Sequence, residues 1–190
     1  MPLHLNKPAP RCLGIAESFF RSRPSSVLAG VVMRGDLRID GLATACATVG
    51  GDDATDAVLK IYKDLDRTDV NVLLLSGAAV SWFNIIDLQE VFDKVQKPLV
   101  CLTYEESQGL ERYILEYFPE PEEKLRRYRA LGERECVLLK TGYEVYVRTL
   151  GATAEDARVL LNKFTLEGRI PEPVRVARLV ARAVLGEICE

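Results

Sequence analysis

Residues 72–75 form an unbroken run of four branched apolar residues, which stops at the small pair Ser76 and Gly77. An apolar run without alternation is typical of a parallel strand that is covered on both faces of a sheet. Open α/β sheets bind their ligands at the carboxyl ends of such strands. We therefore predict that residues 72–75 form a central strand and that Ser76 lies at the rim of any binding site.

The pattern before this stretch predicts three strands and then a helix. The three strands span residues 11–19, 27–33 and 37–49. Their short connections favour an antiparallel meander, with a bulge at Gly41. Apolar positions then recur at helical spacing over residues 54–65. Asp53 is placed to cap this helix, and Asp56 lies in its first turn.

The chain after the central strand alternates between helical and strand-like segments. A helix whose buried face begins at Ile85 ends before Pro98, and a strand follows over residues 99–103. In the next helix we expect Tyr113 and Tyr117 to face inward. The remaining segments are a helix from Pro121 to Gly132, a hairpin of residues 136–139 and 143–148, a helix capped by Thr153, and a last helix with Pro173 in its first turn.

Two aromatic residues, Trp82 and Phe83, stand at the junction between the central strand and the following helix. Aromatic side chains at such a junction usually bury area, so packing in the core is the favoured interpretation. A surface beside Ser76 that stacks a nucleobase is the alternative.

Length and composition indicate one ordinary globular domain. The chain has 190 residues, of which 48% are hydrophobic and 28% charged, enough for one substantial core. We predict a single domain over residues 1–190, with residues 1–10 as a flexible arm. No apolar run reaches the roughly 20 residues that span a bilayer, and residues 1–8 lack the apolar core of a signal peptide, so we expect a cytoplasmic protein without membrane contact.

Charge and cysteine content exclude several classes of site. The five cysteines are far apart and form no C-x-x-C pair, so neither a zinc site nor a disulfide scaffold is indicated. The net charge of −3 argues against a generally basic nucleic-acid coat, although local basic patches remain open. The only histidine, His4, lies in the predicted arm, so a Ser-His or Cys-His nucleophile has no base.

The order of elements is that of the ribonuclease H-like fold. We predict a mixed five-stranded sheet in which the first three strands are antiparallel and the fourth and fifth run parallel to the first, with a helical and hairpin extension at the C-terminal end. Four pieces then suggest a family: Leu13-Gly14-Ile15, residues 49–55, Phe83-Asn84-Ile85-Ile86-Asp87 and residues 170–177. Together they resemble a mainly archaeal, uncharacterised family of the UPF0215 type, domain of unknown function 99, which is distantly similar to endonuclease V.

This resemblance implies a carboxylate site for Mg²⁺, which endonuclease V-like enzymes use to cleave phosphodiesters. Endonuclease V-like enzymes have an acidic residue in the first strand. The matching position in this chain is Ala16, which cannot bind metal, although the next residue, Glu17, can. Side chains alternate along a strand, so Glu17 should point to the opposite face unless the strand end twists. Asp53, or less directly Asp52, matches the acid near the crossover.

Two further positions of the family pattern are also changed. Where the family has an acidic residue at the end of the fourth strand, this chain has Ser76. Where the family often has a histidine in the final helix, this chain has Arg178. The tyrosine-containing wedge with which endonuclease V opens a duplex is replaced by residues 49–51. Asp53 is better explained as a helix cap than as a metal ligand. Asp87 is most simply a partner for the amino end of its own helix.

Two classes of function remain. One is a metal-dependent nuclease or phosphodiesterase that uses a reduced carboxylate set, Glu17 and Asp53, with Mg²⁺. The other is a non-catalytic descendant that binds nucleic acid or a protein partner, without a cofactor. Its contacts would be the rim residue and four arginines: Ser76, Arg21, Arg23, Arg175 and Arg178. We favour the second class, because serine and arginine cannot replace anionic metal ligands. Self-association into a homo-oligomer is left open.

Overall fold

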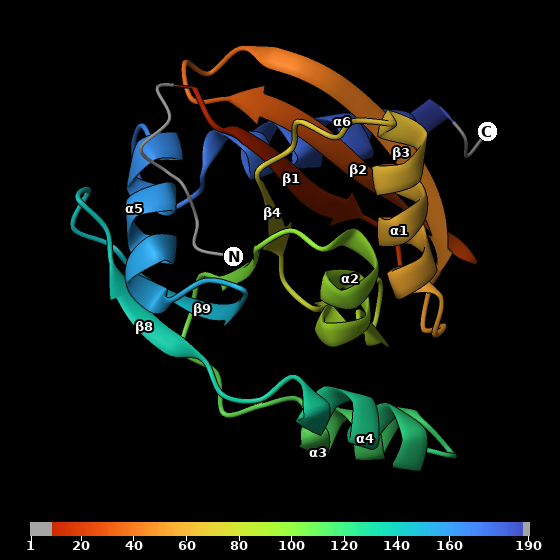
Figure 1. Ribbon diagram of the computed structural model, residues 1–190. Helices are drawn as coiled ribbons and strands as arrows, with labels where there is room; N and C mark the ends of the chain where they lie inside the picture. The colour runs from red at the N-terminus through yellow and green to blue at the C-terminus, as the bar shows by residue number, and fades with distance from the viewer. Residues whose placement is uncertain (1–8, 188–190) are drawn as a thin grey trace.

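A computed structural model, described here for residues 9–187, contains one seven-stranded mixed sheet (Figure 1). The strands are β1 (Arg11–Ser18), β2 (Ser25–Arg34), β3 (Ile39–Thr48), β4 (Val72–Ser76), β7 (Leu99–Thr103), β8 (Glu135–Leu138) and β9 (Glu144–Leu150). Their order across the sheet is β3-β2-β1-β4-β7-β9-β8. β1 pairs in parallel with β4, and β4 with β7, while β1, β2 and β3 form the antiparallel meander. The predicted central strand is therefore confirmed.

The predicted number of five strands is wrong, because the hairpin at the C-terminal side belongs to the main sheet. β9 runs antiparallel to β7, with Leu102 opposite Val147, and β8 pairs with β9. Val145 and Val147 are fully buried, so the hairpin extends the core instead of standing apart from it. The ribonuclease H-like assignment stays a prediction. The predicted bulge is present, since the β2–β3 register shifts between Val32 and Met33, which pair with Gly41 and Ile39.

Helices cover both faces of the sheet, which explains the uninterrupted apolar run of β4. Leu73 and Leu75 pack on the side of α1 (Ala54–Leu65) and α2 (Leu88–Val95). Val72 and Leu74 pack on the other side, against α5 (Ala154–Phe164) and α6 (Glu172–Glu187). Burial of such side chains contributes about 1.5–3 kcal/mol each.

α6 lies unusually close to β1 because of one glycine. A Cβ added at Gly14 would come within 2.5 Å of the backbone of Pro173. Two of the pieces that carry the family resemblance, Leu13-Gly14-Ile15 and residues 170–177, therefore meet in space. Their pairing serves packing.

The starts of the helices depart from the sequence predictions in two places. α5 begins with the expected capping box of Thr153 and Asp156, and the Asp87 carboxylate accepts the Glu90 N–H as the cap of α2. α2 begins at Leu88 and not at Ile85, because a short hairpin of β5 (Ala79–Val80) and β6 (Asn84–Ile85) precedes it. Asp53 stands at the cap position of α1, but its side chain makes no capping bond.

Two helices form a lobe set below the sheet in Figure 1, α3 (Glu111–Tyr117) and α4 (Glu122–Ala130). Ile114 and Leu125 are buried, whereas Tyr113 and Tyr117 are 46% and 41% exposed. The prediction that both tyrosines face inward is wrong. Among the described residues, no helix is long and apolar enough to cross a membrane. The predicted arm, residues 1–10, lies almost entirely outside the described part of the chain.

Candidate functional site

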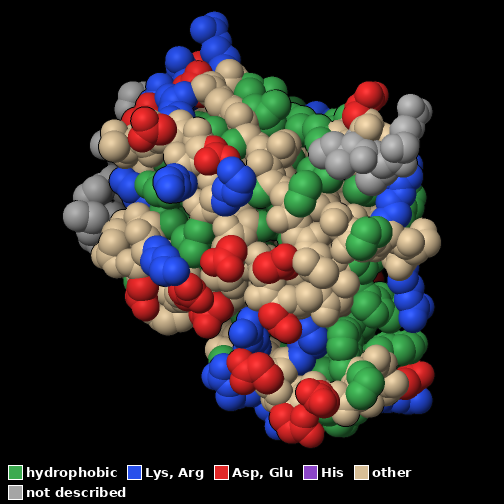
Figure 2. All heavy atoms as spheres, turned by 90° about the vertical axis from the view of Figure 1, so that its right-hand side faces the viewer, with side chains coloured by type: hydrophobic (Ala, Val, Ile, Leu, Met, Phe, Trp, Pro, Cys, Tyr) green, Lys and Arg blue, Asp and Glu red, His purple; other side chains and the backbone are tan. Residues whose placement is uncertain are grey.

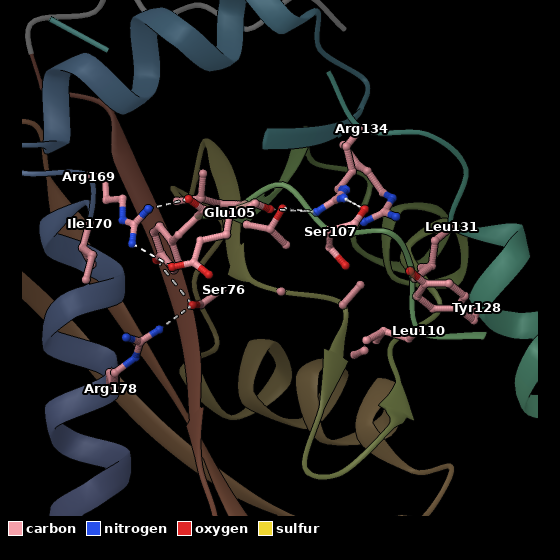
Figure 3. Close-up of a pocket in the computed structure, with 17 residues that line it drawn as sticks. Ser76, Glu105, Ser107, Leu110, Tyr128, Leu131, Arg134, Arg169, Ile170 and Arg178 are labelled. Atoms are coloured by element: carbon pink, nitrogen blue, oxygen red, sulfur yellow. Dashed lines mark hydrogen bonds and ion pairs between the residues drawn. The ribbon is translucent and has the colours of Figure 1, made fainter. Parts of the chain in front are cut away.

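A pocket of about 480 Å³ opens at the carboxyl ends of β4 and β7, at the rim where the sequence predicted a site (Figure 3). Ser76 and Thr103, the last residues of these strands, line it. Four arginines also line the pocket: Arg134, Arg148, Arg169 and Arg178. Glu105 is the one acidic residue of the lining, so the charge of the pocket is strongly positive.

The contact between Arg178 and Ser76 joins α6 to the end of β4. An Arg178 Nη donates to Ser76 Oγ at 3.1 Å, and this hydroxyl lies 3.4 Å from the Tyr104 hydroxyl. The register of the parallel pair sets Ile15 beside Leu75, so Ala16 and Ser76 occupy corresponding positions at the two strand ends. The guanidinium thus contacts one of the two strand-end positions that the resemblance matches to metal-binding acids.

Two other arginines fix the loop that follows β7. Arg134 donates to Thr103 Oγ1 (3.2 Å) and to the carbonyls of Glu105 and Ser107. Arg169 donates to the Tyr104 carbonyl (2.7 Å) and to Glu105 Oε1 (3.0 Å). A guanidinium has five N–H donors, so each arginine keeps donors for a ligand while its position is held by the protein.

Burial also shifts the pKa of two residues that line the pocket, Arg148 and Tyr104. Burial lowers the pKa of Arg148 below its ordinary value, while one Nε–H donates to the Gly132 carbonyl. Burial raises the pKa of Tyr104, against the opposing contacts with Ser76 and Arg178. The pocket therefore combines guanidinium groups with the neutral phenol of Tyr104 and the hydroxyls of serine and threonine, a set of donors suited to anions.

The residues at the strand ends do not fit a divalent metal ion. No group of three Asp, Glu, His or Cys side chains that could hold a metal occurs among residues 9–187. Ala16 offers a methyl group, Ser76 a neutral hydroxyl, and Arg178 a positive charge, whereas Mg²⁺ selects anionic oxygen. Glu17 is the only carboxylate on this stretch of β1.

Glu17 is held by a buried pair of serines and not by the pocket. The Ser81 hydroxyl donates to Glu17 Oε2 (3.1 Å) and lies 2.6 Å from Ser26 Oγ, which donates to the Ala47 carbonyl. A hydroxyl has one proton, so Ser81 donates to only one of Glu17 and Ser26 at a time. Burial raises the pKa of Glu17, against the bonds from Ser81 and the charge of Arg178.

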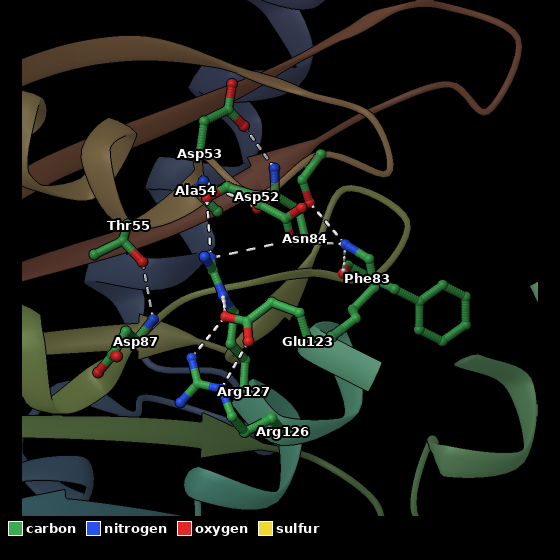
Figure 4. Close-up of polar contacts among 12 residues, drawn as sticks. Asp52, Asp53, Ala54, Thr55, Phe83, Asn84, Asp87, Glu123, Arg126 and Arg127 are labelled. Atoms are coloured by element: carbon green, nitrogen blue, oxygen red, sulfur yellow. Dashed lines mark hydrogen bonds and ion pairs between the residues drawn. The ribbon is translucent and has the colours of Figure 1, made fainter. Parts of the chain in front are cut away.

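Asp53 belongs to a separate network, which we call the Asp53 network: Thr48, Asp53, Ala54 and Asn84. Figure 4 shows Asp53, Ala54 and Asn84 of this network. The Asp53 carboxylate accepts the Thr48 N–H (2.9 Å), the Thr48 hydroxyl (2.7 Å) and the Asn84 amide (2.7 Å). Burial alone would raise the pKa of Asp53, but these bonds hold it below its ordinary value. The predicted capping role is corrected: the fully buried Asn84 caps α1, since its Oδ1 accepts the Ala54 N–H at 3.0 Å.

One buried lysine attaches the α3–α4 lobe to this region. Lys124 Nζ donates to the carbonyls of Gly51 (2.9 Å), Phe83 (3.1 Å) and Gly50 (3.3 Å), and to Asp52 Oδ1 (2.9 Å). The metal role considered for Asp52 is therefore unsupported by its surroundings. The lysine is 6% exposed, so its charge is compensated almost wholly by these oxygens.

The aromatic junction adopts an uncommon backbone. Ser81, Trp82 and Phe83 have φ angles of +45°, +62° and +63°, three successive residues in the left-handed region. This region costs L-residues about 1–2 kcal/mol each, so the surroundings must hold it. The Gly50 N–H donates to the Ser81 carbonyl (2.7 Å), and Lys124 binds that of Phe83. Trp82 and Phe83 are half-buried and not core residues.

The other arginines proposed as contacts lie outside the pocket. The Arg21 guanidinium stacks 3.7 Å from the centre of the Trp82 ring. Arg23 donates to the Leu185 carbonyl near the end of α6. Arg175 forms a bidentate ion pair with Glu172, so its face of α6 is salt-bridged. Of the predicted binding residues, the structure brings only Ser76 and Arg178 together in the pocket.

Sequence reasoning missed Arg134, Arg148 and Arg169. They come from three separate segments, and each is an isolated charge in its local context. Their positions in the sequence could have indicated two of them. Arg134 directly precedes β8, and Arg169 directly precedes Ile170-Pro171, the dipeptide that leads into α6.

Comparisons with known proteins show the family of this chain. A family model described as Endonuclease dU matches residues 8–185. A UPF0215 protein of Pyrobaculum aerophilum is 37% identical over 172 residues, covering 90% of this chain and 92% of that protein. The crystal structure of a protein of unknown function from Archaeoglobus fulgidus has a TM-score of 0.79 and 26% identity, and the match covers 92% of this chain and 98% of that one.

A more distant similarity extends to endonuclease V. The Ciona intestinalis endonuclease V, in complex with DNA that contains an inosine followed by a ribo-adenosine, has a TM-score of 0.64 and 14% identity. The match covers 97% of this chain and 88% of that one. At this identity the likeness concerns the fold alone.

Proposed function

Because the chain belongs to the Endonuclease dU family, whose fold is shared with endonuclease V, we propose that it binds nucleic acid in the arginine-lined pocket and does so without metal-dependent cleavage. The single observation that carries this proposal is the contact of Arg178 with Ser76 beside Ala16. A guanidinium contacts Ser76, the strand-end position that the family resemblance matches to a metal-binding acid, and it offers hydrogen-bond donors to phosphate.

The remaining arginines support phosphate binding. Arg134, Arg148 and Arg169 converge on the same cavity and are held by backbone carbonyls, so little side-chain freedom is lost when an anion binds. The bidentate N–H pairs of arginine match phosphate oxygens. The DNA-bound endonuclease V of Ciona intestinalis supports nucleic acid as the source of the phosphate.

Binding should be tested with a fluorescent single-stranded oligonucleotide by anisotropy, at salt concentrations of about 50–200 mM. Replacing both Arg169 and Arg178 with Ala should weaken binding at least tenfold, equally for different sequences. The slope of log affinity against log salt should flatten by about 1.4, the value for two lost phosphate contacts on a single strand. Arg158→Ala, an exposed arginine of α5 paired with Glu155, is the matched control. Unchanged affinity in the double variant would reject the pocket as the site.

Cleavage should be tested on inosine-containing and deoxyuridine-containing DNA with Mg²⁺ or Mn²⁺. We expect no product from the wild-type protein. The Ala16→Asp, Ser76→Asp double variant would restore two carboxylates at neighbouring strand ends and is the converse test.

A metal-dependent endonuclease is the second candidate, and the description of the family model favours it. Its residues would be Glu17 and Asp53, with Mg²⁺. Cleavage by the wild-type protein that is lost in Glu17→Ala or Asp53→Ala would establish this second function in place of the first.

A further inference from the structure

A cluster of aromatic rings outside the pocket has no role in the function proposed above. It consists of two rings from the left-handed turn and three from the region of α3: Trp82, Phe83, Tyr113, Tyr117 and Phe118. We call it the aromatic platform. Trp82 and Tyr117 have ring centres 5.0 Å apart, and Tyr113 stacks on Tyr117 with an interplanar angle of 7°.

The platform faces solvent. Tyr113 and Tyr117 are each more than 40% exposed, as is Phe20 of the neighbouring β1–β2 turn. Figure 2 views the molecule from the right-hand side of Figure 1. Hydrophobic side chains gather at its lower right, at the level of the α3–α4 lobe, and Lys and Arg side chains lie along the same margin. Rings that serve only packing are normally covered, so this exposure needs another explanation.

Cationic groups accompany the rings. The Arg21 guanidinium lies 3.7 Å from the ring centre of Trp82 and 5.4 Å from that of Tyr117. Within the described residues, neither Arg21 nor Arg23 is ion-paired with a carboxylate. Exposed rings and unpaired arginines together are the composition of surfaces that bind single-stranded nucleic acid, where rings stack bases and arginines follow the backbone.

The backbone of the turn fixes the direction in which the Trp82 and Phe83 rings point. Trp82 and Phe83 hold left-handed φ angles, and the carbonyls on either side of Trp82 are both fixed by other segments. Glycine would adopt this turn without strain, and the chain uses two aromatic residues instead. The segment that leads to this turn begins at Ser76 in the pocket, and Leu110, which directly precedes α3, also lines the pocket, so two segments connect the pocket to the platform.

We propose that the aromatic platform stacks unpaired bases of a single strand whose phosphates occupy the arginine-lined pocket. This inference rests on the proposed function and deepens it, because it names the substrate class as unpaired nucleic acid. Bases stack on the exposed faces of Tyr113 and Tyr117 and on the Arg21 guanidinium, and duplex DNA lacks the free faces that this requires.

The test uses the only tryptophan of the chain as its reporter. Fluorescence of Trp82 in the full-length protein should be followed during titration with a 12-nucleotide thymidine strand, an abasic strand of equal length, and a duplex. We expect quenching and tight binding with the thymidine strand, and at least fivefold weaker binding without quenching for the abasic strand and the duplex. Tyr117→Ala should lower affinity for the thymidine strand about tenfold, as for one lost stacked base, and leave affinity for the abasic strand unchanged.

Tyr143→Ala, an exposed tyrosine of the β8–β9 turn, is the matched control and should leave both affinities unchanged. Equal binding of the thymidine and abasic strands would overturn the stacking proposal while leaving phosphate binding intact. If neither strand binds, both proposals fail. A change in Trp82 emission with protein concentration alone would identify a second copy of the chain as the occupant and also overturn it.

Discussion

The arginine-lined pocket and the Asp53 network lie at different places around the same sheet and differ in how their polar atoms are used. In the Asp53 network, the carboxylate and the Asn84 amide are occupied by partners within the protein, at 2.7–3.1 Å. In the pocket, Arg178 makes one hydrogen bond to a side chain and otherwise faces the cavity. A saturated network stabilises a fold, whereas unused donors around a cavity can bind a ligand.

The largest expected effect comes from removing the lysine beside the Asp53 network. Lys124→Met retains the side-chain length but leaves the carbonyls of Gly51 and Phe83 without their donor. We expect a loss of about 3 kcal/mol in the free energy of unfolding, measured by urea denaturation. Lys140→Met, at an exposed lysine, should be neutral. A stable Lys124→Met variant would show that the lobe is attached by other contacts.

A charge placed inside the Asp53 network should be the next most damaging change. Asn84→Asp sets a second carboxylate where the amide lies 2.7 Å from Asp53 Oδ1, and it removes the donor to the Thr48 carbonyl. We expect about 2 kcal/mol of destabilisation at pH 7. Repulsion raises the pKa of the introduced group in the folded state, so the deficit relative to wild type should shrink below about pH 4 and grow as the pH rises. A deficit that does not vary with pH would contradict this account.

Glu17 provides a smaller test with a defined sign. Its pKa is raised in the folded state by burial, so the stability that it contributes is present at low pH and is lost as the pH rises through the folded value. Glu17→Gln keeps an oxygen that can accept the Ser81 hydroxyl proton and removes the charge, and should raise the thermal midpoint at pH 7 by about 2–4 °C. The gain should disappear below about pH 4, where wild-type Glu17 is protonated. A lower midpoint at pH 7 would show that ionised Glu17 is stabilising.

The smallest change in stability is expected in the pocket itself. Arg178→Gln should alter the free energy of unfolding by no more than about 0.5 kcal/mol, because the residue is exposed and its contact with Ser76 is single. Thermal unfolding and oligonucleotide binding should be measured on the same sample, with binding clearly weakened. A large loss of stability would place Arg178 among the structural residues and weaken the contrast between the two regions.

The sequence predicted those parts of the fold that have a local signature. The run of residues 72–75 identified a strand covered on both faces, and the spacing at Thr153 and Asp156 identified a helix start. The pairing of β9 with β7 joins residues more than 40 positions apart and has no local signature, so the hairpin was set apart from the sheet. The helical period of Tyr113 and Tyr117 defined a face but could not show that this face stays partly exposed.

The candidate site was predicted in its position but only partly in its composition. Ser76 and Arg178 were identified because a strand end and a family pattern indicated them, and they meet in the structure. Arg134, Arg148 and Arg169 converge through the tertiary fold alone. Asp53 was expected to cap α1, and its actual partners, Thr48 and the buried Asn84, could not be predicted from helix-capping rules.

The turn at Ser81, Trp82 and Phe83 has a consequence for chirality. Backbone angles that strain an L-residue are the relaxed helical angles of its mirror image. Chemical synthesis with a D-tryptophan at position 82 should therefore relieve strain while sending the indole in another direction, away from Arg21 and Tyr117. The handedness of one residue would then separate two properties that natural amino acids keep linked here: how easily the loop forms and where its ring points.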